Sequence, residues 1–144
     1  GVVLHGEDLT LALAIPVSDT MAGMTSMGIY REIHEGLVAA LSVTDGGVRL
    51  VLPEDCREGA ACFQSPVPLD IVLDGLKICG GALRRSKAGV LYQGSLRLRN
   101  IPIAAIGAAL SKEHAKFSPP GKMEGNVVSL VEKKYGTGSW INLR

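Results

Sequence analysis

Lys77 is the residue whose placement most strongly indicates chemistry. It lies in the apolar run "LDIVLDGLKICGGALRR", residues 69–85, with Cys79 two positions on and a pair of glycines directly after that cysteine. Glycine in a strand often marks a close approach by a ligand or by another backbone. An ammonium group beside such a gap can donate to a carbonyl or phosphate oxygen. A solvated lysine paired with Asp70 on an outer sheet face explains the same spacing, and both interpretations stay open.

The cysteines are the second candidate set. Cys56, Cys62 and Cys79 are odd in number and irregularly spaced, which does not indicate a disulfide framework. No histidine lies close to Cys56 or Cys62 in the sequence, so their spacing is a poor match to a zinc site. A lone cysteine is usually a small buried hydrophobe, and it becomes a nucleophile where a neighbour such as a lysine lowers its pKa. We therefore expect free thiols, no metal ligands and a reducing, cytoplasmic setting.

Composition indicates one folded domain with an aliphatic core. The 144 residues are 47% hydrophobic, 20% charged and only 4% aromatic, which argues against disorder. The formal net charge is +1 and no basic run stands out, so nothing favours nucleic acid as a partner. No apolar run is long enough to span a bilayer. We expect a single domain over residues 1–144 with no nucleic-acid or membrane partner.

The elements that must position Lys77 alternate between strands and helices. Apolar and small residues alternate over 9–15, which predicts a strand that follows an earlier strand across the turn at residues 6–8. Apolar residues at helical spacing predict a helix over 26–41, with Thr25 or Ser26 as its N-cap. The remaining predicted elements are strands over 48–52 and 90–100 and helices over 101–110 and 126–134, the last capped by Asn126.

The dipeptide Asp74-Gly75 predicts a two-residue hairpin turn, because it favours the type I′ geometry that matches strand twist. A regular ladder from this turn places Lys77 opposite Val72 and makes Asp70 its diagonal neighbour. Two faces follow from that register: Ile71, Leu73, Leu76 and Ile78 toward the core, and Asp70, Val72, Lys77 and Cys79 away from it.

Residues 61–96, "ACFQSPVPLDIVLDGLKICGGALRRSKAGVLYQGSL", resemble the core of the lipoate–protein ligase and octanoyltransferase family. Members show a G-x-K-[IV]-x-G-[SAG]-A segment, followed by basic residues and a strand with Q-G-S. The first segment is matched by Gly75, Lys77, Ile78, Gly80, Gly81 and Ala82, and the second by Arg84, Arg85, Gln93, Gly94, Ser95 and Leu96. Residues 1–16 and 30–41 also resemble the family's first strands and next helix.

The resemblance implies an α/β fold of the α+β type: a mixed, largely antiparallel sheet with helices packed on it, as in biotin and lipoate ligases. It implies that Lys77 contacts the carbonyl or acyl-phosphate end of an octanoyl or lipoyl group. Cysteine-dependent octanoyltransferases look closest, because Cys62-Phe63 matches their nucleophile. The substrate-binding residues it implies are His5, Asp70, Gly80, Gly81, Ala82, Gln93, Gly94 and Ser95. Family members have a longer N-terminal portion, so a truncated member is expected.

Three functions are compatible with the resemblance. In the first, Cys62 takes an octanoyl group from acyl carrier protein and passes it, without a cofactor, to a lysine of a lipoyl domain of a 2-oxoacid dehydrogenase or of a glycine cleavage protein. Lys77 would favour the thiolate and donate to the carbonyl oxygen. In the second, free lipoate or octanoate is activated by ATP and Mg²⁺ through lipoyl-AMP. In the third, the chain is a non-catalytic member that binds carrier protein.

Overall fold

The computed structural model describes residues 8–56, 65–111 and 121–135. Cys62 and His5 lie outside the described residues, as does the strand expected before the turn at residues 6–8. The chain separates into two compact units, Gly1–Glu113 and His114–Arg144, and each is described by itself. The single domain over residues 1–144 stays a prediction.

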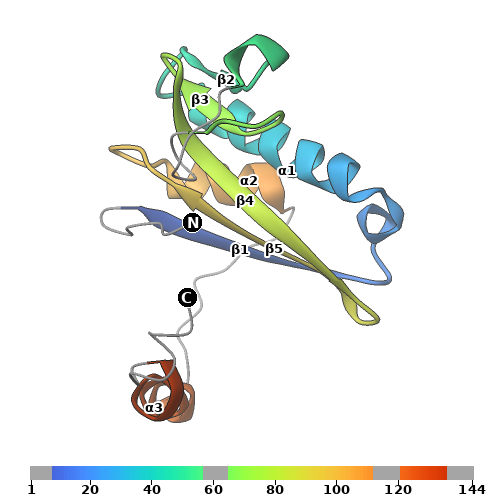
Figure 1. Ribbon diagram of the computed structural model, residues 1–144, viewed down its shortest axis with the longest axis vertical. Helices are drawn as coiled ribbons and strands as arrows, with labels where there is room; N and C mark the ends of the chain where they lie inside the picture. Colours follow the sequence, from blue (N-terminus) through green and yellow to red (C-terminus); the bar gives the residue numbers. More distant parts are fainter. Residues whose placement is uncertain (1–7, 57–64, 112–120, 136–144) are drawn as a thin grey trace. The chain divides into compact units, whose positions relative to one another are not determined.

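The first unit is built on a sheet whose described strands run in the order β1-β5-β4-β3-β2. All pairings between these strands are antiparallel, which agrees with the expected α+β class. The long strands β4 and β5 form a hairpin, and β1 lies along the other side of β5 (Figure 1). The strands are β1 (Leu9–Pro16), β2 (Val48–Leu50), β3 (Ile71–Leu73), β4 (Leu76–Ser86) and β5 (Gly89–Leu96).

Two helices of this unit, α1 (Ser26–Leu41) and α2 (Ile103–Leu110), cover one face of the sheet (Figure 1). The predicted bounds of α1 are confirmed, and Thr25 is its N-cap, with Oγ1 accepting from the N–H of Gly28 at 3.1 Å. Helix α2 begins two residues later than predicted, because Pro102 occupies the position before it. Two single turns of 3₁₀ helix, η1 (Thr20–Gly23) and η2 (Pro53–Asp55), lie in the connections.

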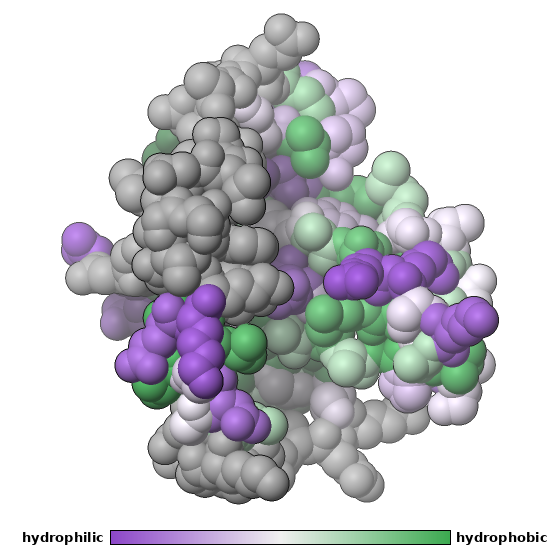
Figure 2. Space-filling model, turned by 60° about the horizontal axis from the view of Figure 1, so that its bottom comes forward, coloured by the Kyte–Doolittle hydropathy of each residue, from purple (hydrophilic) through white to green (hydrophobic). Residues whose placement is uncertain are grey.

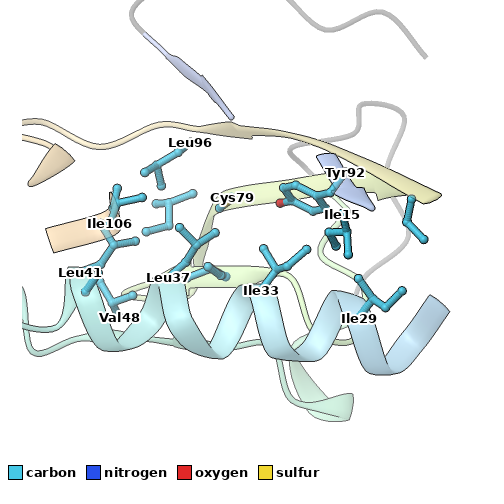
Figure 3. Close-up of a cluster of buried hydrophobic side chains, with 14 residues drawn as sticks. Ile15, Ile29, Ile33, Leu37, Leu41, Val48, Cys79, Tyr92, Leu96 and Ile106 are labelled. Carbon is cyan, nitrogen blue, oxygen red and sulfur yellow. The ribbon is translucent and has the colours of Figure 1, made fainter. Parts of the chain in front are cut away.

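The core lies between α1 and the sheet. Leu37 and Leu41 of α1 are fully buried, and they point toward Cys79, Leu96 and Ile106 (Figure 3). Burying one such aliphatic side chain stabilises the fold by roughly 1.5–3 kcal/mol, so this stripe fixes the helix on the sheet. The fixed helix then determines where its polar side chains can reach.

The predicted hairpin turn is confirmed, but the predicted ladder beyond it is wrong. Asp74 and Gly75 have φ angles of 51° and 77°, both positive as a type I′ turn requires. Val72 pairs with Lys77 as predicted, and the next pair is Ile71 with Cys79. The register shift leaves one extra residue on β4, which is a β-bulge.

The bulge changes the side of the sheet on which Cys79 lies. It is fully buried in the core, contrary to the prediction that it shares a face with Lys77. Ile78 also packs in the core, as predicted. Leu76, predicted to face the core, is 73% exposed because it directly follows the turn at the edge of the unit.

The second unit contains α3 (Gly121–Leu130) followed by a π-helical turn, η3 (Val131–Tyr135). The helix starts five residues before the predicted cap, so Asn126 lies inside it and that prediction is wrong. The start directly follows Pro119-Pro120, and proline is tolerated before a helix but not within it. The capping preference of Asn126 was therefore outweighed by the proline pair.

Figure 2 shows one face of the molecule with the described residues coloured by hydropathy. Apolar and strongly polar side chains of the described residues alternate there.

Candidate functional site

Lys77 and Asp70 form a buried ion pair. The Nζ atom of Lys77 lies 2.7 Å from Oδ2 of Asp70, and the side chains are 10% and 1% exposed. The pair expected from the sequence therefore exists, but it is not the solvated surface pair that was one of the two interpretations. Removing two charges from water is unfavourable unless both are well paired, so the surroundings of Asp70 must supply further hydrogen bonds.

The carboxylate of Asp70 accepts from two more donors. The hydroxyl of Tyr30 donates to Oδ1 at 2.8 Å, and the backbone N–H of Val67 donates to Oδ2 at 3.0 Å. With Lys77, both oxygens are engaged, as a buried ionised carboxylate requires. Burial, and then the negative charge of Asp70, raise the pKa of Tyr30, so its hydroxyl keeps its proton and remains a donor.

Tyr30 also links α1 to β4. Its hydroxyl oxygen accepts from the backbone N–H of Gly81 at 2.9 Å while its proton goes to Asp70. In the sequence Tyr30 belongs only to the apolar stripe of the helix. A polar partner could have been expected from the residue type alone, because the hydroxyl of a buried tyrosine usually forms a hydrogen bond.

His34 is a second polar residue of α1 that the sequence did not indicate. It is fully buried, with Nδ1 2.6 Å from the carbonyl oxygen of Leu69 and Nε2 2.8 Å from the hydroxyl of Tyr92. A carbonyl can only accept, so Nδ1 donates to Leu69 and Nε2 accepts from Tyr92. Burial lowers the pKa of His34 to about 4, which keeps the ring neutral near pH 7.

Gly80 makes room for the lysine. A Cβ atom at this position would lie 2.7 Å from Cε and 2.9 Å from Nζ of Lys77, and 3.0 Å from Oδ1 of Asp70. The group that approaches the strand closely is therefore the side chain of Lys77 itself. Any larger residue at position 80 would displace the ammonium group.

The ion pair lies at one side of a pocket of about 350 Å³. This volume is within the range of small-molecule sites, which are mostly apolar with a few polar groups. Lys77, Asp70 and Tyr30 supply charge and hydrogen-bonding groups. The rest of the lining consists of Ser26, Met27, Val67, Pro68, Gly81 and Leu83. The pocket is an open hollow in the surface with a mostly apolar lining and the charged pair at one side.

Cys79 is a poor nucleophile. Burial raises the pKa of its thiol to about 12, so the thiolate is scarce at neutral pH. Cys56 is exposed, and both are free thiols.

No group of three metal-binding side chains occurs within residues 8–56, 65–111 and 121–135.

Solved structures with a similar fold include two proteins whose descriptions name a lipoate protein ligase. Protein Ta0514 from T. acidophilum matches with a TM-score of 0.63 at 17% identity, covering 92% of this chain and 63% of that one. Lipoate-protein ligase A bound with ATP matches with a TM-score of 0.58 at 18% identity, covering 92% and 64%. No family model matches the chain. At these identities the structures establish the fold alone.

Curated relatives decide the family. The chain is 31% identical to octanoyltransferase LipM of Kyrpidia tusciae over 105 residues, which is 67% of this chain and 38% of that protein. It is 29% identical to octanoyltransferase LipM of Staphylococcus aureus over 109 residues, 70% of this chain and 39% of that one. The chain belongs to the lipoate–protein ligase and octanoyltransferase family. It spans less than half the length of these relatives.

The residues that match the family motif divide between two faces of the sheet. Gly80 pairs with Ser95 and Ala82 pairs with Gln93, so these four share one face, and of the four Gly80 lies against the Lys77 side chain. Ala82 and Gln93 are exposed there, and the Ser95 hydroxyl donates to Asp8.

Gly81 and Gly94 face the opposite side. A Cβ atom at Gly81 would lie 2.6 Å from the ring of Tyr92, and one at Gly94 would meet the Tyr92 hydroxyl. These two family glycines therefore make room for a core tyrosine. The backbone of Gly81 nevertheless lines the same pocket as Lys77, and its N–H donates to Tyr30.

Arg85, another family match, fastens α1 to β4. Its guanidinium donates to the carbonyl of Ala22 at 3.0 Å and to the hydroxyl of Ser26 at 3.1 Å, and it also contacts the carbonyl of Met24. These bonds hold the start of α1, and with it Tyr30, beside β4.

Among the described residues, no helix is long and apolar enough to cross a membrane.

Proposed function

We propose that the protein containing this chain transfers an octanoyl or lipoyl group onto a lysine of a lipoyl carrier domain. The observation that carries the proposal is the buried ion pair of Lys77 with Asp70 beside an apolar pocket, in a chain whose curated relatives are octanoyltransferases. The carrier domain would belong to a 2-oxoacid dehydrogenase or a glycine cleavage protein, and the reaction would take place in the cytoplasm.

In the proposed reaction Lys77 stabilises negative charge. Its ammonium group donates to the thioester carbonyl of octanoyl acyl carrier protein as that oxygen becomes an oxyanion. Asp70 holds the ammonium in place through the 2.7 Å contact. Removing one such donor from an acyl-transfer site costs about 10²–10³-fold in kcat.

Cys62 is the proposed nucleophile. Its thiolate attacks the thioester carbon, a new thioester forms on the enzyme, and the thiolate of the acyl carrier protein leaves. The amine of the carrier-domain lysine then attacks this acyl-enzyme, loses a proton and becomes an amide as the Cys62 thiolate is released. A thioester is already activated, so neither a nucleotide nor a metal is required. The unreactive thiol of Cys79 supports the choice of another cysteine.

The alternative is an ATP-dependent lipoate–protein ligase that forms lipoyl-AMP from free lipoate or octanoate. The similarity in fold to lipoate-protein ligase A bound with ATP favours it. Lys77 would then contact the acyl-phosphate end, ATP and Mg²⁺ would be needed, and Cys62 would have no role. A non-catalytic member that binds carrier protein is the third candidate.

The deciding experiment incubates the full-length protein with octanoyl acyl carrier protein in the absence of ATP. The proposal expects a covalent octanoyl adduct that hydroxylamine removes. Cys62→Ser loses the adduct, and Cys56→Ser is the matched control that keeps it. Transfer that persists in Cys62→Ser and requires ATP and free lipoate would establish the ligase instead. No adduct and no turnover under either condition would favour the non-catalytic member.

A further inference from the structure

Two residues of α1, one helical turn apart, hold the same short segment of chain. Tyr30 contacts the carboxylate of Asp70, and His34 contacts the backbone carbonyl of the preceding Leu69. The two rings lie against each other with centroids 4.0 Å apart. Both contacts therefore come from one rigid surface of the helix, and they hold a side chain and its neighbouring peptide together.

The segment they hold is strained. Leu69 has a φ of 72°, in the left-handed region, and its side chain is 6% exposed. A non-glycine residue in that region is unfavourable and persists only where its surroundings determine it. The hydrogen bond from His34 to the Leu69 carbonyl is one such determinant. The turn is also closed by the N–H of Asp70, which donates to the carbonyl of Val67 at 3.0 Å.

This conformation sets the direction of the Asp70 carboxylate, which in turn contacts Lys77. In order from the helix, the connections are His34 to Leu69, Tyr30 to Asp70, and Asp70 to Lys77. The far nitrogen of His34 accepts from Tyr92, which fixes the orientation of the imidazole ring.

We propose that Tyr30 and His34 are positioning residues that place the ammonium group of Lys77 for acyl transfer. The proposal rests on the proposed function in that Lys77 is the group they serve. Neither residue needs to touch the acyl group. Each acts through Asp70, whose direction they determine, and a misplacement of about 1 Å at a reacting group can reduce a rate 10²-fold.

The first test is kinetic and uses the full-length protein. Tyr30→Phe removes only the hydroxyl and is expected to lower kcat on the order of 10- to 100-fold, with KM for the carrier domain unchanged. His34→Gln is expected to act in the same direction. In a Lys77→Ala background neither substitution should lower the residual rate further, because residues that act as a unit are not additive. If either substitution lowers kcat by the same factor in Lys77→Ala as in the wild-type protein, the two residues act independently of Lys77.

The second test does not depend on activity. Competitive labelling of lysines with acetic anhydride, read by mass spectrometry, measures the reactivity of Lys77 directly. Loosening Asp70 in Tyr30→Phe should raise the labelling of Lys77 several-fold relative to the other lysines. If labelling changes but Lys77→Ala retains full acyl transfer, the positioning stands and the proposed function fails. Unchanged labelling together with wild-type kcat in Tyr30→Phe overturns the positioning.

Thr25→Ala is the matched control, since it weakens the same helix without touching the site. It removes the N-cap bond to Gly28 and is expected to lower the midpoint of denaturant unfolding. If Tyr30→Phe acted only by loosening α1, Thr25→Ala would show the same fall in kcat and the same rise in Lys77 labelling. The proposal expects kcat and Lys77 labelling at wild-type values in this control. Should His34→Gln fail to fold, Tyr30→Phe carries both measurements.

Discussion

The ammonium of Lys77 and the carboxylate of Asp70 lie 2.7 Å apart at a place where the carboxylate is 1% exposed. Neither charge is easily removed alone, because the other would stay buried without its partner. The same two residues are close in sequence and joined by a hairpin whose turn is Asp74-Gly75. Local sequence thus brings them together, and α1 completes their surroundings.

Removing the lysine should reduce both stability and activity. Lys77→Met leaves a buried carboxylate and is expected to cost about 3–5 kcal/mol in free energy of unfolding. Adding Asp70→Asn should recover part of that loss, because the uncompensated charge is gone. Urea unfolding of both variants measures this. A double variant no more stable than Lys77→Met would contradict the buried ion pair.

Lys77→Arg should also lose acyl transfer, because a forked guanidinium does not replace a compact ammonium.

Gly80→Ala should reduce acyl transfer while the protein remains folded. The added Cβ atom would lie 2.7 Å from Cε of Lys77, so the lysine side chain must move. A loss in kcat on the order of 10- to 100-fold is expected. Gly46→Ala is the control, since a Cβ atom there meets nothing within 4 Å. Equal activity of both variants would mean that Lys77 tolerates the displacement.

His34 should make the fold less stable in mild acid. Burial lowers its pKa to about 4 from 6.5, so between these values the unfolded chain binds more protons than the folded one. Stability is therefore complete above pH 6.5 and falls as the pH drops toward 4. From pH 7 to pH 5 the loss due to His34 is about 2 kcal/mol. Denaturant unfolding at both values measures it, and His34→Gln should show a smaller loss. An equal loss in the variant would assign the effect to other groups.

Cys79 should resist alkylation in the native protein. Its thiol is fully buried, and burial raises its pKa to about 12. Iodoacetamide at pH 8 should modify the exposed Cys56 and leave Cys79 unmodified until the protein is denatured, as peptide mass spectrometry will report. Modification of Cys79 at a rate close to that of Cys56 would contradict its burial and restore it as a candidate nucleophile.

The sequence predicted those parts of the fold that depend on local signals. The bounds of α1 follow from its apolar spacing and its Thr25 cap, and the hairpin follows from Asp74-Gly75. The hairpin also predicted that Asp70 lies within reach of Lys77, and the ion pair exists although the register beyond Val72 differs from the expected one. The bulge in β4 was not predicted, because no residue type marks it and it arises where two strands adjust to a shared core.

The surroundings of the ion pair could not be predicted for a different reason. Tyr30 and His34 contact residues that are 35 to 58 positions away in the chain. Periodicity assigns a residue to one face of a helix, but it does not give the group that a polar atom on that face will meet. Only the packing of α1 on the sheet supplies that information.

These sequence separations also bear on the order in which the molecule folds. Helix α1 and the hairpin at Asp74-Gly75 are held by contacts between near neighbours and can form quickly. The bonds from Tyr30 to Asp70 and to Gly81 close chain segments of 40 and 51 residues, and that loss of chain entropy must occur before they contribute. We therefore expect the helix and hairpin to be formed in the folding transition state and the site around Lys77 to be assembled after it. Substitutions at Tyr30 should then speed unfolding and leave the folding rate nearly unchanged.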